Sequence, residues 1–358
     1  MSLQTVVYTL DPAAMDAELI WRAAAVIRAG GLVAFPTETV YGLGANALDA
    51  GAVRGIFAAK ERPAHDPLIV HLADAADLPR VARDIPPLVP ELAARFWPGP
   101  LTLVLPRGEA IPAEVTAGGA TVAVRVPAHP VAQALIRAAG VPIAAPSANR
   151  FGRLSPTRAA DVLADLEGRI DVVLDGGPTT VGLESTVLSL VGTPTILRPG
   201  GVSREALEAI LGPVAVWERS PQAPEALPES PGLLLQHYAP RAPLLLYLGA
   251  PAALRAALLA EARRYQQENV RVGLLLAAED VPFFAGEEWL IEVAGSVADL
   301  ETVARQLFAA LRALDAAGAE VILARDFGVA GLGLAIRDRL TRAAGGRVIE
   351  VTAPADEV

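Results

Sequence analysis

The sequence predicts an α/β protein with two domains, and three observations lead to that prediction. At 358 residues, the chain is long enough for two or three domains with substantial cores. Strand-like runs and helical patterns occur together before residue 212, and they alternate more regularly after residue 241. Between these regions, residues 213–232 are rich in Pro, Ser and Glu and lack an apolar period. We therefore expect domains over 1–212 and 242–358, joined by a linker at 213–241.

The first helix is expected over residues 11–30. Asp11 can cap its N-terminus, Pro12 suits its first position, and Gly30 can stop it. A short apolar run at 32–35 then predicts a buried strand.

A polar, glycine-bearing segment at 36–44 follows that strand, and Asp49 is expected to cap a second helix that ends near Lys60. Further strand-like runs lie at 67–72, 101–105, 121–126, 141–145, 170–174, 186–191 and 195–197. Helical patterns lie near 74–83, 87–96, 130–139, 157–167 and 203–211. Because some strands follow one another without a helix between them, a twisted mixed sheet is favoured over a purely parallel one.

After the linker, helical segments separate most of the strand-like runs. These runs lie at 244–248, 272–276, 289–293, 321–324 and 348–351. Right-handed crossovers between them predict a Rossmann-like parallel sheet of about five strands.

The composition indicates a soluble cytoplasmic protein without disulfides. The mean hydropathy is +0.40. Even so, the longest charge-free stretches, such as 242–254, are shorter than the roughly 18–20 apolar residues of a membrane-spanning helix. The N-terminus has no basic segment of the kind that opens a signal peptide. The net charge of −10 argues against a broad nucleic-acid-binding surface.

Several common catalytic motifs are absent. The chain has no cysteine, no HExxH, no GxSxG and no GxxxxGK[ST]. Its histidines lack metal-ligand spacing, so no resident metal site is expected. They are His65, His71, His129 and His237.

Two short motifs could bind phosphate. Lys60 is the only lysine among thirty basic residues, and with Arg62 it forms a Lys-x-Arg pair at the predicted end of a helix. Ser147 and Asn149 form a Ser-x-Asn motif after an apolar strand, where α/β folds often bind ligands. A solvated basic helix end and an ordinary polar turn are the alternatives.

Other candidates lie at strand ends and beside the linker. Arg125 lies in an apolar strand, so its charge requires a ligand carboxylate or an internal acid. His71 is either a ligand contact or a core residue, and Arg198 ends another strand. His237 and Tyr238 follow the linker, which could fold back over a site. Several cations, few bases and no nucleophile favour phosphoryl or nucleotidyl transfer on anionic substrates.

An ordered set of motifs resembles the YrdC-like threonylcarbamoyl-AMP synthases. Over roughly residues 13–212, the matching motifs are 36–44 (PTETVYGLG), Lys60-x-Arg62, Pro67-Leu68, 96–102 (FWPGPLT), 124–127 (VRVP), 146–149 (PSAN), Gly152, 155–157 (SPT), 184–186 (EST) and 197–200 (LRPG). Later segments are similar to those of the longer, two-domain members. These segments are 231–232 (PG), 237–240 (HYAP) and 331–336 (GLGLAI).

The resemblance implies an enzyme that joins L-threonine, bicarbonate and ATP into threonylcarbamoyl-AMP and releases pyrophosphate. This is the first step toward N6-threonylcarbamoyladenosine in tRNA. A divalent ion, normally Mg²⁺, would accompany ATP. A downstream tRNA threonylcarbamoyl-transferase complex would receive the adenylate, with at most weak tRNA contact by this chain and none with membranes.

The resemblance also assigns residues. Lys60 and Arg62 are expected to be catalytic. The nucleotide and its phosphates are expected at Lys60, Arg62, Asp66, Thr121, Ser147, Asn149, Ser155, Arg198, His237 and Tyr238. Threonine is expected at Thr39, His71, Arg125, Ala145 and Ser185.

Two departures from the family pattern concern the phosphate side. Asp66 stands where many relatives have Asn, so it could hold Mg²⁺ or turn outward. Before His237 the chain reads Leu-Leu-Leu-Gln236, where relatives usually carry more polar or basic residues.

Two other functions remain open at this point. The chain could be a YrdC-like RNA-binding module without synthase activity, or a carbamoyl transferase that acts on another acceptor.

Overall fold

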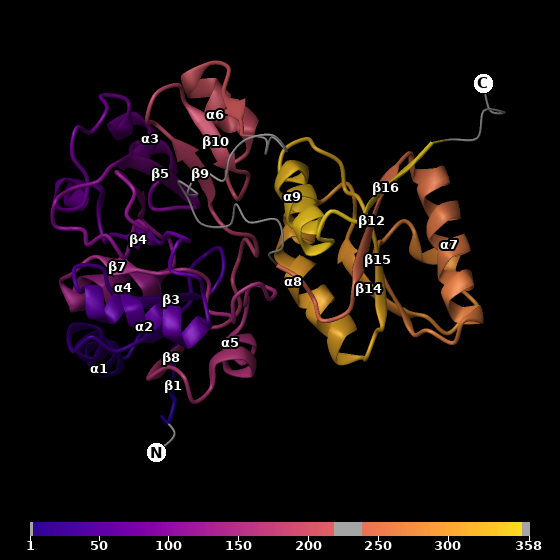
Figure 1. The fold of residues 1–358 in the computed structure, drawn as a ribbon, viewed down its shortest axis with the longest axis horizontal. Helices are drawn as coiled ribbons and strands as arrows, with labels where there is room; N and C mark the ends of the chain where they lie inside the picture. The colour runs from indigo at the N-terminus through magenta and orange to yellow at the C-terminus, as the bar shows by residue number, and fades with distance from the viewer. Residues whose placement is uncertain (1–2, 218–237, 353–358) are drawn as a thin grey trace. The chain divides into compact units, whose positions relative to one another are not determined.

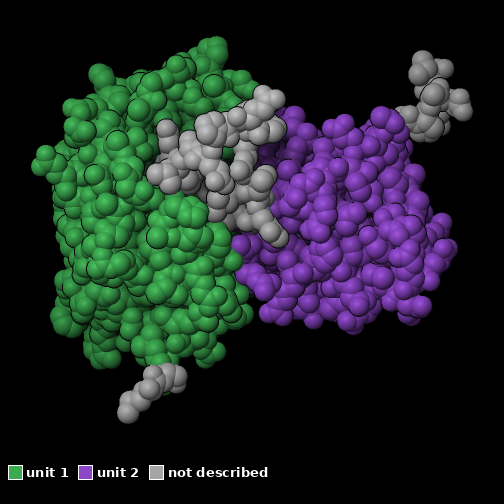
Figure 2. Space-filling model, in the orientation of Figure 1, with its two compact units in different colours: residues 1–151, 155–234 green, residues 152–154, 235–358 purple. Residues whose placement is uncertain are grey.

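The computed structural model describes residues 3–217 and 238–352 (Figure 1). The chain divides into two compact units, coloured separately in Figure 2. The first unit comprises Met1–Phe151 and Ser155–Leu234, and the second comprises Gly152–Leu154 and Leu235–Val358.

The first unit contains a mixed sheet, as the sequence predicts, and this sheet has eleven strands among the described residues. The strands are β1 (Val6–Thr9), β2 (Val33–Phe35), β3 (Gly42–Asn46), β4 (Ile69–His71), β5 (Leu101–Pro106), β6 (Thr121–Arg125), β7 (Ile143–Ala144), β8 (Val172–Asp175), β9 (Thr186–Ser189), β10 (Thr195–Arg198) and β11 (Ala215–Val216). Of these strands, β1, β3 and β11 were not predicted. The order of the strands across the sheet is β1-β8-β2-β3-β7-β4-β6-β5-β9-β10-β11. The pairs β4·β6 and β5·β9 are parallel, whereas β5·β6 and β9·β10 are antiparallel.

Helices cover both faces of the central strands of this sheet, which explains why most residues of these strands are buried. The helices are α1 (Ala17–Arg28), α2 (Ala50–Lys60), α3 (Val89–Phe96), α4 (Pro130–Ala139), α5 (Ala159–Leu166) and α6 (Arg204–Leu211). Successive strand residues point to opposite faces. Val33 and Phe35 therefore join the apolar cluster of α1 and α4, while Ala34 joins the cluster that contains α2.

The first helix starts later than predicted. Asp11 accepts a hydrogen bond from the N–H of Ala13 at 2.8 Å, but it caps only a turn. The N-cap of α1 is Asp16, whose Oδ1 accepts from the N–H groups of Glu18 at 2.8 Å and Leu19 at 3.4 Å. The helix thus begins near the first residues that it buries, because burial of an apolar face stabilises a helix more than a capping residue does. The Asp49 cap of α2 is confirmed.

The glycine-bearing segment after β2 contains a strand that the sequence did not reveal. Gly42–Asn46 forms β3, which pairs antiparallel with β2 and β7. A Cβ atom on Gly44 would lie 2.7 Å from the Phe35 ring and 2.8 Å from Ile143 Cγ2. Glycine is therefore required here for close packing, although glycine normally indicates a turn.

Two further segments differ from the expectation. The helical pattern at 74–83 forms a 3₁₀-helix, Ala75–Arg80, which includes Pro79. Within the predicted linker, β11 pairs in parallel with β10, and the N–H of Trp217 donates to the carbonyl of Ile196 at 2.8 Å. The sheet of the first unit therefore continues past residue 212.

The second unit contains the expected parallel sheet of five strands among the described residues. The elements are β12 (Leu244–Gly249), α7 (Pro251–Gln267), β13 (Val272–Ala277), a 3₁₀-helix (Val281–Phe284), β14 (Leu290–Gly295), α8 (Leu300–Ala316), β15 (Val321–Arg325), α9 (Gly333–Ala343) and β16 (Val348–Val351). The strand order is β14-β13-β15-β12-β16. Within the described residues, no helix is both long and apolar enough to cross a bilayer.

A buried ion-pair cluster joins two strand ends of the second unit. Asp280, which follows β13 and is fully buried, accepts a hydrogen bond from Arg325 Nη1 at 2.7 Å. Its other carboxylate oxygen lies 3.6 Å from Arg255 Nη1 on α7. Removing one partner of a buried pair leaves the other charge without compensation.

We predict that Asp280→Ala lowers the free energy of unfolding by about 3–5 kcal/mol, because it leaves the buried Arg325 guanidinium without its counter-charge. Urea titration followed by circular dichroism measures the change. The control is Glu320→Ala, which breaks the exposed Arg271–Glu320 pair and should cost less than about 1 kcal/mol. Equal decreases in the free energy of unfolding of the two variants would contradict the prediction.

Candidate active site

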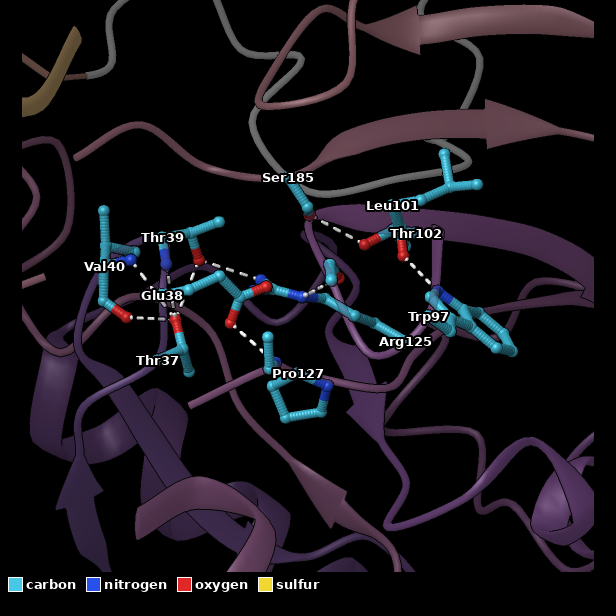
Figure 3. Close-up of polar contacts among 12 residues, drawn as sticks. Thr37, Glu38, Thr39, Val40, Trp97, Leu101, Thr102, Arg125, Pro127 and Ser185 are labelled. Atoms are coloured by element: carbon cyan, nitrogen blue, oxygen red, sulfur yellow. Dashed lines mark hydrogen bonds and ion pairs between the residues drawn. The ribbon is translucent and has the colours of Figure 1, made fainter. Parts of the chain in front are cut away.

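The guanidinium of Arg125 is buried at the end of β6 and is held by three oxygen atoms (Figure 3). Nη2 donates to Glu38 Oε1 at 2.5 Å, Nη1 donates to Thr39 Oγ1 at 2.9 Å, and Nε donates to the Gly99 carbonyl at 3.2 Å. The other Glu38 oxygen accepts the backbone N–H of Ala128 at 2.9 Å. An internal acid thus balances the charge of Arg125, which is one of the two partners that the sequence allowed.

The loop that carries Glu38 and Thr39 is fixed by its own hydrogen bonds. Thr37 Oγ1 accepts from the N–H groups of Thr39 at 3.2 Å and Val40 at 3.3 Å, and it donates to the Val40 carbonyl at 2.7 Å (Figure 3). The N–H of Val181 also donates to the Glu38 carbonyl at 2.7 Å. Hydrogen bonds within the protein therefore fix the residues around Arg125.

His71 lies beside Arg125, because β4 and β6 are parallel and the two residues are paired in register. Its ring packs edge-on against Phe35, with the centroids 6.2 Å apart, and its Nδ1 lies 3.3 Å from the Ile69 carbonyl. Burial lowers the pKa of His71 to about 3, and the Arg125 charge also lowers it. At neutral pH the ring is uncharged, so it can contribute hydrogen bonds but no positive charge.

Ser185 connects two of the predicted sites. Its Oγ lies 2.7 Å from Thr102 Oγ1 on β5 (Figure 3). Arg198, at the end of β10, donates through Nη2 to the Ser185 carbonyl at 2.9 Å and to Ser185 Oγ at 3.2 Å. Ser185, which is expected to contact threonine, is thereby hydrogen-bonded to Arg198, which is expected to contact the phosphates.

Lys60 brings the Lys-x-Arg and Ser-x-Asn motifs together. Its side chain is buried at the end of α2, and Nζ donates to the carbonyls of Ser147 and Asn149, both at 2.5 Å. The backbone carbonyl of Lys60 also accepts the N–H of Phe151 at 2.9 Å. Burial lowers the pKa of Lys60 well below its usual value, and the neighbouring Arg62 adds to that effect. The lone lysine therefore holds the 147–151 loop, whatever else it binds.

Asp66 points inward, which excludes the outward orientation left open by the sequence. It is fully buried, and its Oδ2 lies 2.9 Å from Arg62 Nη2. Arg62 also donates to the Asp66 carbonyl at 3.2 Å and to the Pro67 carbonyl at 2.8 Å. Burial raises the pKa of Asp66, while the charges of Arg62 and Lys60 act in the opposite direction.

The structure adds three polar residues to which the sequence reading gave no role. Glu38 pairs with Arg125, Thr102 bonds Ser185, and the buried Glu184 accepts from Ser155 Oγ at 2.5 Å. All three lie in the quoted motifs. The requirement that the charge of Arg125 be balanced was the signal that could have indicated Glu38.

The remaining predicted residues are placed as follows. Thr121 is half-buried at the start of β6, and Ala145 is buried directly after β7. Tyr238 belongs to the second unit, where it is 1% exposed and stacks on Phe308 at 5.7 Å. His237 and most of the predicted linker lie outside the described residues. The roles of these residues remain predictions.

Comparison with known proteins gives matches over nearly the whole chain. Residues 25–200 match the Sua5/YciO/YrdC family, described as "Telomere recombination", and residues 202–345 match "Threonylcarbamoyl-AMP synthase, C-terminal domain". The chain is 48% identical over 332 residues to the threonylcarbamoyl-AMP synthase of Bacillus subtilis, covering 92% of this chain and 94% of that protein. It is 45% identical over 337 residues to that of Pyrococcus abyssi, covering 92% and 95%.

A solved structure agrees with these matches. The crystal structure of P. abyssi Sua5 complexed with L-threonine superposes with a TM-score of 0.90 at 42% sequence identity. The superposition covers 97% of this chain and 100% of that one.

We predict that His71→Gln reduces the loss of stability in mild acid. The unfolded chain binds a proton below the usual histidine pKa of 6.5, whereas folded His71 binds one only near pH 3. The stability contributed by the neutral ring is therefore complete above pH 6.5 and is lost as the pH falls, by about 2 kcal/mol between pH 6.5 and 5. Urea unfolding at several pH values measures the slope in each protein. Equal slopes in wild type and variant would refute the prediction.

Proposed function

Because the chain belongs to the two-domain family of threonylcarbamoyl-AMP synthases, we propose that it joins L-threonine, bicarbonate and ATP into threonylcarbamoyl-AMP and pyrophosphate. The observation that carries the proposal is that one unit buries both a guanidinium suited to a carboxylate and a cluster of cations suited to phosphates. Arg125 is the first, and Lys60, Arg62 and Arg198 form the second, since all three act electrostatically on Asp66. Such a reaction must bring two anions together and stabilise the pyrophosphate that leaves.

The threonine carboxylate binds at Arg125. Three of the five guanidinium N–H groups are used, and the other two have no partner in the part of the chain that the structure describes. Glu38 balances the charge of Arg125, so the guanidinium can stay buried. Thr39, His71, Ala145 and Ser185 complete the side that receives threonine. The threonine-bound P. abyssi structure supports this assignment at the level of the substrate.

The phosphates of ATP bind among the second set of residues. Arg62 and Arg198 supply buried guanidinium groups, and Lys60 fixes the loop of Ser147 and Asn149 against them. We expect further contacts to the nucleotide from Thr121, Ser155, His237 and Tyr238, and Asp66 lies beside Arg62 at the same phosphates. Fixed donors in a water-poor site stabilise charge on a leaving group strongly, because they need no reorganisation.

The chemistry requires no covalent intermediate with the protein. The threonine amine adds to bicarbonate-derived CO₂ and loses a proton, giving a carbamate. A carbamate oxygen then attacks the α-phosphorus, and the bond to pyrophosphate breaks. Positioning and electrostatic stabilisation account for catalysis of this kind, which is nucleotidyl transfer.

Magnesium would enter this site as a companion of ATP. Among the described residues, no group of three carboxylate or histidine side chains could hold a metal ion. The buried Asp66 carboxylate is ion-paired with Arg62 but accepts no hydrogen bond within those residues, so its oxygens can also face a cation that accompanies ATP. When bound, the ion would neutralise part of the triphosphate charge and polarise its oxygens.

The product is an activated adenylate that a second enzyme must use. We expect a tRNA threonylcarbamoyl-transferase to receive it and to form N6-threonylcarbamoyladenosine, so that this chain performs the first step of the modification. Such a transfer requires no broad RNA surface on this chain, which agrees with its net charge of −10.

Pyrophosphate release tests the proposed reaction. With ATP and Mg²⁺, release should require both threonine and bicarbonate, because only the carbamate attacks the α-phosphorus. A coupled phosphate assay with each substrate omitted in turn measures this requirement. Release that continues unchanged without threonine would refute the proposed function.

We predict that Arg125→Lys raises the KM for threonine at least tenfold and changes the KM for ATP less than threefold. A lysine ammonium cannot contact Glu38, Thr39 and a substrate carboxylate with the geometry of a planar guanidinium. Steady-state kinetics with each substrate varied measures both constants. The assignment would be wrong if the KM for ATP rose as much as that for threonine.

A further inference from the structure

A buried carboxylate lies among the cations that we assign to phosphate. Asp66 has no exposed surface, and its Oδ2 lies 2.9 Å from Arg62 Nη2. Lys60, His65 and Arg198 also act on it electrostatically. Neither carboxylate oxygen accepts a hydrogen bond from any described residue. An acid at this place lowers the positive charge of a site that must bind a polyanion.

The backbone holds Asp66 in this position. The N–H of Asp66 donates to the Pro63 carbonyl at 3.2 Å, and the N–H of Leu68 donates to the Val115 carbonyl at 2.8 Å. Arg62 binds the carbonyls of both Asp66 and Pro67, so its guanidinium stays beside the carboxylate. Asp66 therefore places a fixed negative charge in the site, because its carboxylate cannot turn outward into solvent.

A fixed negative charge distinguishes between the two forms of ATP. Free ATP carries about four negative charges at neutral pH, whereas its magnesium complex carries about two. At equal distance, Asp66 repels free ATP about twice as strongly as the complex. The buried environment strengthens this difference, because little water screens the charges.

We propose that Asp66 makes this site select the magnesium complex of ATP over free ATP. The inference rests on the proposed function, since it takes the Lys60, Arg62 and Arg198 cluster as the phosphate site. Asp66 is then a residue that determines which form of the nucleotide binds. The enzyme then requires the metal already when ATP binds, and not only in the chemical step.

Isothermal titration calorimetry without threonine tests this inference through binding alone. ATP is titrated into the full chain in excess Mg²⁺ and again in EDTA, and the ratio of the two Kd values is compared between wild type and Asp66→Asn. Asparagine keeps the shape and removes the charge, so it should help free ATP more than the complex. We expect the Kd ratio of free ATP to MgATP to fall at least tenfold.

A matched control removes another buried carboxylate that is paired with arginine. Asp280→Asn, in the second unit, should leave the Kd ratio at the wild-type value. If Asp66→Asn does not fold, Asp66→Ser removes the same charge and gives the same readout.

Each outcome decides the question. If the Kd ratio of free ATP to MgATP in Asp66→Asn stays within twofold of the wild-type ratio, the inference is overturned. Equal weakening of both forms of ATP also overturns it, because Asp66 would then act only by holding Arg62. If wild type binds neither form, the proposed function fails instead, so the two failures can be told apart.

Discussion

The first unit depends on one constraint, which is that a positive charge taken out of water must be compensated by oxygen atoms of the protein. Lys60, Arg62, Arg125 and Arg198 are all buried, and the oxygens that hold Lys60 and Arg125 come from segments far apart in the chain. Lys60 binds carbonyls 87 and 89 positions away, and Arg125 binds Glu38 across 87 positions. These cations therefore tie loops together as well as preparing a site for anions.

The same constraint helps to fix the loops of the site. The segment at Glu38 is held twice, once by the turn at Thr37 and once by the buried charge of Arg125. Close strand packing supports this arrangement, because Gly44 lets β3 lie against Phe35 and Ile143. Donors fixed in this way can stabilise developing charge without reorganisation.

Part of this organisation could be predicted from residue patterns. The apolar runs and the cap at Asp49 placed most strands and α2, and the regular alternation after residue 241 predicted the parallel sheet. The predicted start of α1 was wrong because Asp11 and Asp16 are both adequate caps, and only packing selects between them. The strand at Gly44 was missed because its glycines resemble a turn until the neighbouring side chains are known.

Sequence alone determined the residue types at the site and their order, since motif spacing and the apolar period are local properties. It predicted cations at strand and helix ends, a chain without a nucleophile, and a resemblance that the comparisons then confirmed. Only the tertiary structure decided how the charges are paired. Glu38 balances the charge of Arg125, Lys60 holds two carbonyls, and Asp66 faces inward to Arg62. Pairing depends on which distant segments share a buried volume, and no local pattern contains that information.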